Sequence, residues 1–512
     1  MGGSLLLGVD IGTSGSKGVL IDTEGRILAE GYAEHDVSRP RSGWAEHDPE
    51  EVWWGDFVKI TGRILKDSQV DSADVVGICV SGLCPDVAAV DKDGRPVRPG
   101  ILYADVRPVD EIRVGKESIG DNRSLDTTGN VISTQSTWPK MLWIKRNEPR
   151  NWDRTFKFLS GHSYVVMKLT GEYSQDYTVA SMSGLFDSRN LKWDAELVDL
   201  AEVSLEKLPH ACPAHEVVGE VTSEAAAETG LACGTPVIAG CCDGVASMLS
   251  AGVTENGESV FFYGTTGVLL ICTDRLVPDP RLMNAVNAIP GKYVLVGAAM
   301  ATSGAIIKWF RDEFAPLEKA AERQGGVSAY QALDSQASKV PPGSEGVIIL
   351  PYFAGERTPI FDPLARGIIF GLLLSHTRAH VYRAALEAVA YGLNHHIEIL
   401  RELNAMPTKI FAVDGGARSR LWRQIVSDVT EVPQHYISKT PGAPYGGAYL
   451  AGYGTGTFHD FETLRAWIEV EETTEPRPEA HRTYAKFYSI YRKMYSRIKD
   501  LYVEDAESLG LV

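Results

Sequence analysis

The sequence predicts an α/β protein with more than one domain, and three observations indicate this fold class. Segments with strand patterns and helix patterns alternate along the chain, as is typical of α/β proteins. The chain has 512 residues, which is too long for a single hydrophobic core. Two turns, Gly12-Thr13 and Gly264-Thr265, lie about half a chain apart, each between apolar strands. We therefore expect two similar halves that close on one polyphosphate.

The first half begins with a predicted antiparallel meander. An apolar strand leads into the turn at Gly12, and two further strands over 17–21 and 26–33 are joined by an Asp-Thr-Glu-Gly turn. Apolar residues at helical spacing predict a helix over 50–65. Further strands are expected at 75–80, 87–90 and 236–239. The last of these leads toward Asp243.

The second half repeats this alternation. Continuous apolar runs predict strands at 268–273, 293–297, 347–351 and 409–413. Apolar residues at helical spacing predict helices at 306–314, 380–403, 421–429 and 483–503. The boundary is expected near 250–257, just before the second turn, which divides the chain into domains 1–252 and 253–512.

Composition and charge exclude several classes of protein. The formal net charge of −17 argues against a non-specific nucleic-acid binder and against a partner with an anionic membrane surface. Asp10 interrupts the first apolar run, which predicts neither a signal peptide nor a membrane anchor. We therefore expect a cytoplasmic protein with a small-molecule substrate. The oligomeric state is left open, with a homodimer as one form.

The cysteines predict reduced thiols. There are seven of them, an odd number, and several lie in apolar strand-like runs. Cys241-Cys242 is the one adjacent pair. Neighbouring residues of a strand point to opposite faces, and no cluster of His and Cys completes a zinc set. The sequence therefore does not favour a metal role for this pair.

The first Gly-Thr turn has the composition of a phosphate site. Small residues expose backbone N–H groups, so Gly12, Thr13 and Ser14 are candidates to face phosphate oxygens, with Lys17 as a candidate cation. Asp10 ends the preceding strand, where a carboxylate can orient Mg²⁺ directly or through water. The alternative is a simple hairpin with a side-chain-stabilised turn.

The second turn and a later glycine pair carry the same type of signal. Gly264-Thr265-Thr266 is flanked by predicted strands. Gly415-Gly416 stands between a strand and a helix, where a ring or a phosphate can approach the backbone. An ordinary strand-to-helix turn is the alternative reading of the pair. The two Gly-Thr turns together predict a nucleotide site more strongly than either does alone.

Asp243 is the candidate general base. It follows a buried apolar strand and precedes Gly244. An aspartate there can cap a helix, or it can accept the proton of an attacking hydroxyl. Phosphoryl transfer passes through a loose transition state, so an ordinary carboxylate is a sufficient base.

These motifs together resemble the FGGY carbohydrate kinases, over nearly the whole length. The resemblance is carried by Leu7 to Lys17, Gly240 to Asp243, Gly264 to Thr266, Asp414 to Ala417, and Gly367 to Gly371 followed by His380 and Ala384 to Glu387. It implies two actin-like ATPase (ribonuclease H-like) domains around a central cleft, the first binding the sugar and the second the nucleotide. It also implies that Asp243 is catalytic, that ATP and Mg²⁺ are used, and that Asp10 serves the metal. The nucleotide residues implied are Gly12, Thr13, Ser14, Lys17, Gly264, Thr265, Thr266, Gly304, Gly415, Gly416, Ala417 and Ser419.

Three segments resemble the xylulokinase branch: Gly43 to Pro49, Pro139 to Trp143 and Pro351 to Pro359. This implies transfer of the γ-phosphate to a ketopentose such as D-xylulose. The sugar residues implied are Trp44, Cys84, Asp86, Asp105 and Asp243.

One departure leaves the sugar open. Xylulokinases typically carry Gln-Met-His-Gly after the Ser-Gly at 81–82, whereas this chain has Leu83-Cys84-Pro85-Asp86. Asp105 and Arg107 are retained. The alternatives are kinases for another ketose, a polyol or an aldonate, such as ribulose, erythritol or gluconate. An actin-like ATPase switch and a catalytically silent sugar sensor are rivals from other classes.

Overall fold

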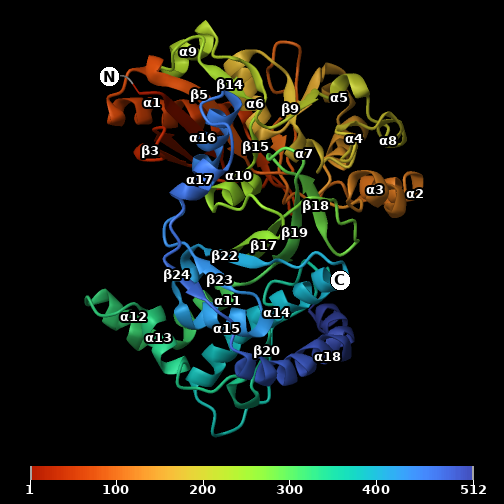
Figure 1. Cartoon of the computed structure of the whole chain (residues 1–512). Coiled ribbons are helices and arrows are strands. Elements are labelled where there is room, and N and C mark those ends of the chain that lie inside the picture. Colours follow the sequence, from red (N-terminus) through yellow and green to blue (C-terminus); the bar gives the residue numbers. More distant parts are fainter. Residues whose placement is uncertain (1–2, 510–512) are drawn as a thin grey trace. The chain divides into compact units, whose positions relative to one another are not determined.

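The computed structural model describes residues 3–509, which form two compact units. The first unit contains the residues up to Asn256 together with Cys272–Leu295 and Pro441–Ile468. The second contains Gly257–Ile271, Val296–Thr440 and the residues from Glu469 onward. Each unit contains strands and helices, and two large sheets are present, which confirms the predicted α/β class (Figure 1). That 1–252 holds the sugar and 253–512 the nucleotide stays a prediction.

The sheet of the first unit has the order β13-β14-β5-β1-β2-β3, with β15 paired to β5. Strands β1, β2 and β3 are consecutive antiparallel neighbours, as the sequence predicts. In contrast, β1 and β15 both run parallel to β5. The strands are β1 (Leu5–Ile11), β2 (Gly15–Ile21), β3 (Ile27–Glu34), β5 (Val75–Gly82), β13 (Val217–Glu220), β14 (Pro236–Ile238) and β15 (Cys241–Cys242).

Helices cover both faces of this sheet (Figure 1). Helices α10 (Asp243–Ser250) and α16 (Ala443–Gly454) pack together on one face, and α16 contacts β1 and β5. Helices α1 (Gly55–Ser68) and α6 (Gly161–Thr170) share one hydrophobic core with the opposite face. The helix predicted over 50–65 begins instead with a π-helical turn, Pro49–Trp54, before α1. Strand β1 and helix α16 approach each other closely at Gly8, because a Cβ there would lie 1.9 Å from a carbonyl oxygen of α16.

The remaining elements of the first unit are short helices and strands, some of which share a second hydrophobic core. The helices are α2 (Val109–Ser118), α3 (Asp121–Thr128), α4 (Trp138–Asn147), α5 (Pro149–Arg154), α7 (Tyr177–Ala180), α8 (Ala195–Leu200), α9 (Ser223–Thr229) and α17 (Glu462–Trp467). The short strands are β4 (Glu46–His47), β6 (Ala88–Val90), β7 (Gly100–Ile101), β8 (Lys157–Leu159), β9 (Ser174–Asp176), β10 (Phe186–Asp187), β11 (Lys192–Trp193) and β12 (His210–Cys212).

The second large sheet has the order β18-β19-β17-β16-β22-β23-β24. Its strands are β16 (Glu258–Tyr263), β17 (Gly267–Thr273), β18 (Met283–Val286), β19 (Tyr293–Met300), β22 (Lys409–Val413), β23 (Gln434–Tyr436) and β24 (Glu472–Thr474). A separate two-stranded antiparallel sheet is formed by β20 (Ile348–Leu350) and β21 (Ile368–Phe370).

Six helices of the second unit accompany this sheet: α11 (Gly304–Phe314), α12 (Pro316–Arg323), α13 (Ala329–Ala337), α14 (Arg378–Glu402), α15 (Arg420–Thr430) and α18 (Pro478–Ser508). Helices α14 and α18 are tied by buried polar groups, since Arg383 pairs with Glu387 at 2.8 Å and donates to the Tyr484 hydroxyl at 2.7 Å. The helices predicted at 306–314, 380–403, 421–429 and 483–503 are confirmed. Across residues 3–509, no helix combines the length and apolarity needed to span a membrane.

Candidate active site

The parallel strands of the first unit gather acidic residues at one sheet edge. Asp10 near the end of β1 pairs with Ser81 near the end of β5, and Cys241 of β15 pairs with the same serine. Carboxyl ends of parallel strands meet at one edge, where α/β proteins bind ligands. Asp243, the first residue of α10, therefore follows β15 at the edge where Asp10 lies.

The two carboxyl groups perturb each other. The Ser81 hydroxyl donates to Asp10 Oδ1 at 2.8 Å, and burial together with the charge of Asp243 raises the pKa of Asp10 to about 7. Burial also raises the pKa of Asp243, whose Oδ1 accepts from the Gly244 N–H at 2.6 Å. Two partly buried carboxylates that disfavour each other's ionisation are suited to a cation that neutralises both. The donor set at Asp10 thus fits the Mg²⁺ that the sequence predicts.

Gly240 fixes the path of the backbone that leads to Asp243. Gly240 adopts φ +83, and a Cβ there would lie 2.0 Å from the Val80 carbonyl oxygen. No other residue fits this turn without displacing β5. The glycine in Gly-Cys-Cys-Asp is thus required by the backbone path that leads to Asp243.

The first Gly-Thr turn joins β1 to β2 through a very tight bend. A Cβ on Gly12 would lie 2.4 Å from the Gly15 carbonyl oxygen. Ser14 and Lys17 are exposed, whereas Gly12 and Thr13 are partly buried. The Thr13 hydroxyl is 3.4 Å from the Tyr103 hydroxyl. The turn therefore presents small polar groups and one exposed cation, as a phosphate site needs.

A histidine with a buried side chain supports this turn, and no sequence pattern predicted it. His35 Nε2 lies 3.1 Å from the Gly12 carbonyl oxygen, and His35 Nδ1 lies 2.7 Å from Asp56 Oδ2. The Ser16 hydroxyl donates to the same carboxylate oxygen at 2.9 Å. The signal that could have found this pair is weak, since a single His at the end of a strand and an Asp in a helix are both common.

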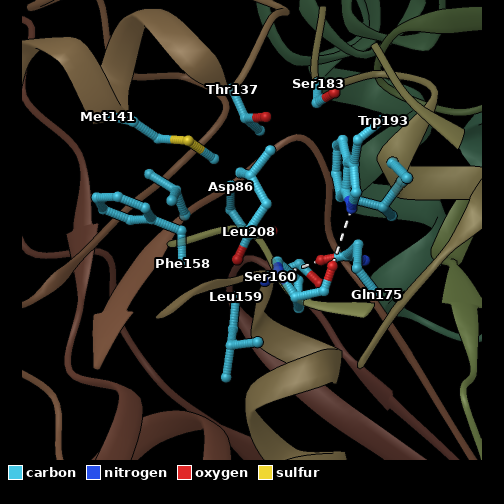
Figure 2. Close-up of a pocket in the computed structure, with 14 residues that line it drawn as sticks. Asp86, Thr137, Met141, Phe158, Leu159, Ser160, Gln175, Ser183, Trp193 and Leu208 are labelled. Carbon is cyan, nitrogen blue, oxygen red and sulfur yellow. Dashed lines mark hydrogen bonds between the residues drawn. The ribbon is translucent and has the colours of Figure 1, made fainter. Parts of the chain in front are cut away.

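Asp86 is buried beside a small cavity. Its Oδ2 accepts from the Gly161 N–H at 2.8 Å, and its Oδ1 has no hydrogen-bond partner among the described residues. Burial raises the pKa of Asp86 to about 7. The cavity, about 20 Å³, has room for one water and is lined also by Thr137, Ser160 and Gln175 (Figure 2). Asp86 thus has an acceptor free for a water or a ligand hydroxyl.

Trp44 and Asp105 belong to a network built around Arg107. The Arg107 guanidinium lies 3.7 Å from the centre of the Trp44 ring. Asp105 is fully buried, and it accepts from Arg107 and from the Ala45 N–H at 2.7 Å. Arg107 also pairs with buried Glu46 at 2.8 Å. The oxygens of Asp105 are therefore already engaged by protein donors.

Replacing Asp105 should cost stability. The Asp105→Asn variant leaves the buried Arg107 without its closest counter-charge, so we expect the free energy of unfolding to fall by about 3 kcal/mol. Denaturant unfolding followed by circular dichroism measures this change. The matched control is Asp110→Asn, because Asp110 is exposed and pairs with exposed Arg113 at 3.5 Å, and its effect should stay within about 0.5 kcal/mol. Equal losses in the two variants would contradict the network.

His162 is a second histidine that no sequence pattern predicted, and it lies close to the sheet edge that carries Asp10 and Asp243. His162 is fully buried, its Nε2 is 2.7 Å from Asp176 Oδ2, and its Nδ1 is 3.1 Å from the Ser160 hydroxyl. Its side chain borders the backbone of Gly82 and Gly240. The remaining predicted sugar residue, Cys84, follows β5 and is partly buried, with its Sγ beside that of Cys242.

The second turn connects β16 to β17 in the second unit, and the start of α11 holds it. The Gly304 N–H donates to the Gly264 carbonyl at 2.8 Å, and the Ala305 N–H donates to the Thr265 carbonyl at 3.1 Å. A Cβ on Gly304 would lie 2.6 Å from the Gly264 oxygen. Thr265 is exposed and Thr266 partly buried. Gly304 therefore acts on this turn through its backbone.

The glycine pair lies at the same edge of the second sheet. Strand β22 runs parallel to β16, so the residues after Val413 come beside Gly264. No atom lies within 4 Å of a Cβ placed on Gly415, which leaves space for a ligand. Ala417 is buried, and the Ser419 hydroxyl caps α15 by accepting from the Trp422 N–H at 3.1 Å.

Comparison with known proteins decides the family. The model for the N-terminal domain of the FGGY family of carbohydrate kinases matches residues 5–250, and the model for the C-terminal domain matches residues 260–455. The chain belongs to the FGGY family of carbohydrate kinases. As a member of this family, the FGGY kinase described here is a sugar kinase, which confirms the predicted enzyme class.

Relatives of this FGGY kinase carry two different substrate names. A gluconokinase of Bacillus subtilis is 30% identical over 509 residues, covering 98% of each chain. A xylulose kinase of Staphylococcus epidermidis is 30% identical over 500 residues, covering 97% of each chain. Among solved structures, a xylulose kinase from Rhodospirillum rubrum matches with a TM-score of 0.90 and 33% identity, covering 97% of this chain and 99% of that one.

Proposed function

We propose that this FGGY kinase transfers the γ-phosphate of ATP to a hydroxyl of a ketopentose, with D-xylulose as the first candidate. The observation that carries the proposal is the pair Asp10 and Asp243 at one edge of the first sheet, next to the Gly12 turn. The similarity to xylulose kinases supports the choice of sugar.

Asp243 is the proposed general base. Its position at the start of α10 leaves the carboxylate partly exposed, so a substrate hydroxyl can reach it. A carboxylate with a raised pKa holds a proton more strongly than an ordinary aspartate, which suits the removal of a hydroxyl proton as the phosphoryl group is transferred. The Gly244 N–H holds Oδ1, which leaves Oδ2 as the oxygen available to the substrate.

Asp10 is the proposed residue for Mg²⁺, and Ser81 orients it. When bound, Mg²⁺ supplies positive charge to the phosphates and lowers the cost of ionising both carboxyl groups. In the first unit we propose that Gly12, Thr13, Ser14 and Lys17 bind phosphate. In the second unit the proposed phosphate residues are Gly264, Thr265 and Thr266, with Gly304 supporting them, and the proposed adenosine residues are Gly415, Gly416, Ala417 and Ser419.

The charge around the proposed sugar residues supports a neutral sugar. Asp10, Asp86 and Asp243 are acidic, while Arg107 is engaged by Asp105 and Glu46. Burial lowers the pKa of Lys140 to about 8, and its ammonium donates to the Thr134 carbonyl at 2.8 Å. An aldonate carboxylate would need an uncommitted cation, whereas the charge of Arg107 is already balanced by two carboxylates. The Nη1 of Arg107 has no hydrogen-bond partner among the described residues, so it is the one donor there that an anionic sugar could use.

Gluconate is the second candidate, and two observations favour it. The Bacillus subtilis gluconokinase matches this chain as fully as the xylulose kinases do. The Leu83-Cys84-Pro85-Asp86 segment also departs from the Gln-Met-His-Gly of xylulokinases. The two candidates differ in charge, so a substrate panel distinguishes them.

The test is ADP release by the purified protein with MgATP across ketoses, polyols and aldonates. We expect D-xylulose to give the highest kcat/KM, with gluconate lower by about 10-fold or more, which corresponds to about 1.4 kcal/mol of transition-state binding. A preference for gluconate would contradict the neutral-sugar proposal. ADP release that none of the compounds stimulates, with ATP bound, would contradict the kinase proposal for this panel and favour the ATPase switch.

A further inference from the structure

The adjacent cysteines of β15 each meet a cysteine of the β5 segment. Their side chains point to opposite sides, as expected for neighbours in a strand. Cys241 hydrogen-bonds with Cys79 of β5, whereas Cys242 meets Cys84, which follows β5. Strands β5 and β15 are paired, so the backbone brings these thiols together. The pair Cys84–Cys242 lies next to Asp243, and although Cys84 is a predicted sugar residue, the proposed phosphoryl transfer does not use the chemistry of either thiol.

Three sulfur atoms and a carboxylate cluster at this point. The Sγ atoms of Cys84 and Cys242 are 2.6 Å apart, and the Sδ of Met182 is 3.6 Å from Cys84 Sγ. Asp243 Oδ1 lies 3.4 Å from Cys242 Sγ. The ligating atoms of Cys84, Cys242 and Asp243 all lie within 4.8 Å of one another.

We propose that Cys84, Cys242 and Asp243 form a binding site for a thiophilic divalent cation such as Zn²⁺ or Cd²⁺, with the thioether of Met182 beside it. Thiolates select soft cations, and the carboxylate adds a third charged ligand. Occupancy would remove Asp243 from catalysis, so the cation would inhibit the kinase. That inhibitory consequence rests on the proposed role of Asp243, whereas the binding itself does not.

The geometry needs only a small adjustment. Two Zn–S bonds of about 2.3 Å at a tetrahedral angle place the sulfurs about 3.8 Å apart. Two other separations are already near this value: that between Cys84 Sγ and Met182 Sδ, and that between Cys242 Sγ and Asp243 Oδ1. The two thiols must therefore separate by about 1 Å, which rotation about their side-chain bonds provides.

Binding should release protons. The hydrogen bond with Cys242 and burial raise the pKa of the Cys84 thiol well above its usual range, so this thiol is uncharged without a metal. A cation must displace its proton to bind the sulfur. The affinity should therefore rise with pH, and wild-type protein should acidify an unbuffered solution as it binds. This readout needs no substitution and no sugar.

The direct experiment titrates the protein with Cd²⁺ under a phosphine reductant, without nucleotide, and records the thiolate-to-Cd²⁺ charge-transfer absorption. We expect one equivalent to bind wild-type protein, and Cys84→Ser and Cys242→Ser to lower the affinity by at least about 100-fold. The matched control is Cys233→Ser, because Cys233 is exposed, and it should bind as wild type does. Circular dichroism checks that each variant is folded.

Three outcomes would overturn the proposal. Wild-type affinity in both Cys84→Ser and Cys242→Ser would place the Cd²⁺ elsewhere, and loss of the absorption only in Cys241→Ser would assign it to Cys79 and Cys241. Absence of the absorption, with two thiols missing from a thiol count before reduction, would identify Cys84 and Cys242 as a disulfide-forming pair instead. If Cd²⁺ binds as expected but no sugar stimulates ADP release, the metal site stands and the proposed kinase substrate fails.

Discussion

The Asp243→Asn variant should lose about 10²- to 10⁴-fold in kcat with the preferred sugar while it still binds ATP. Asparagine keeps the size of the side chain but cannot take a proton from the attacking hydroxyl. The residual rate should also respond less to pH. In the wild type, kcat should rise from acid toward neutral pH, because burial raises the pKa of Asp243 and the base must be ionised.

Two controls separate this effect from unfolding. Because burial disfavours the charged form of Asp243, the amide should leave the free energy of unfolding unchanged or higher at neutral pH. The exposed Asp110→Asn variant should keep wild-type kcat. Turnover by Asp243→Asn within about tenfold of wild type, or a pH profile that matches it, would show that another group takes the proton.

The Asp10→Asn variant should trade activity for stability. We expect kcat to fall by about 10²- to 10³-fold, because the proposed Mg²⁺ loses its carboxylate. At neutral pH the same variant should be more stable than wild type, by on the order of 2 kcal/mol, since burial and Asp243 raise the pKa of Asp10 from 3.8 to about 7. This free energy is smaller than the equivalent of the full pKa shift of Asp10, because the carboxylate is only partly buried.

The sign of this stability change follows from the proton balance. Below about pH 4, Asp10 is protonated in both the folded and the unfolded chain, so the variant and the wild type should match. Between about pH 4 and pH 7 the unfolded chain loses the proton first, and the wild type loses stability relative to the variant. Urea unfolding at pH 4.5, 6 and 7.5 measures the gap, which is the unfolding free energy of the variant minus that of the wild type. A gap that closes toward pH 7.5, or a variant that is less stable there, would contradict the buried-charge account.

Local patterns predicted much of the fold, because they depend on neighbouring residues. The meander of β1, β2 and β3 was predicted from apolar runs separated by Gly-containing turns. Helix α14 was predicted from residues at helical spacing and begins and ends close to the expected positions. The helices α2 to α5 were not predicted, since their short segments lack a long periodic pattern.

The contacts that build the site depend on residues far apart in the chain. Helix α16 packs against β1 although more than 400 positions separate them, and nothing in its small-residue composition indicates this partner. His35 supports the Gly12 turn through a contact that only the folded chain creates. Asp105 was predicted as a sugar residue from its place in a motif, and its engagement by Arg107 could be seen only in three dimensions.

The contacts of the cysteines could be predicted from the sequence only in part. The sequence indicated correctly that Cys241 and Cys242 point apart, because neighbours in a strand do so. It could not indicate that Cys84 would complete a pair with Cys242, since that contact depends on the pairing of β15 with β5.

We propose that this protein couples ATP cleavage to phosphorylation of a sugar. The most direct measurement is the ratio of sugar phosphate to ADP formed from D-xylulose and MgATP, with both products quantified in one reaction by mass spectrometry. We expect equal amounts of the two products from the wild type, and both products lowered by about 10²-fold or more in Asp243→Asn. Formation of ADP without sugar phosphate would contradict this proposal and would make the protein an ATPase rather than a kinase for this sugar.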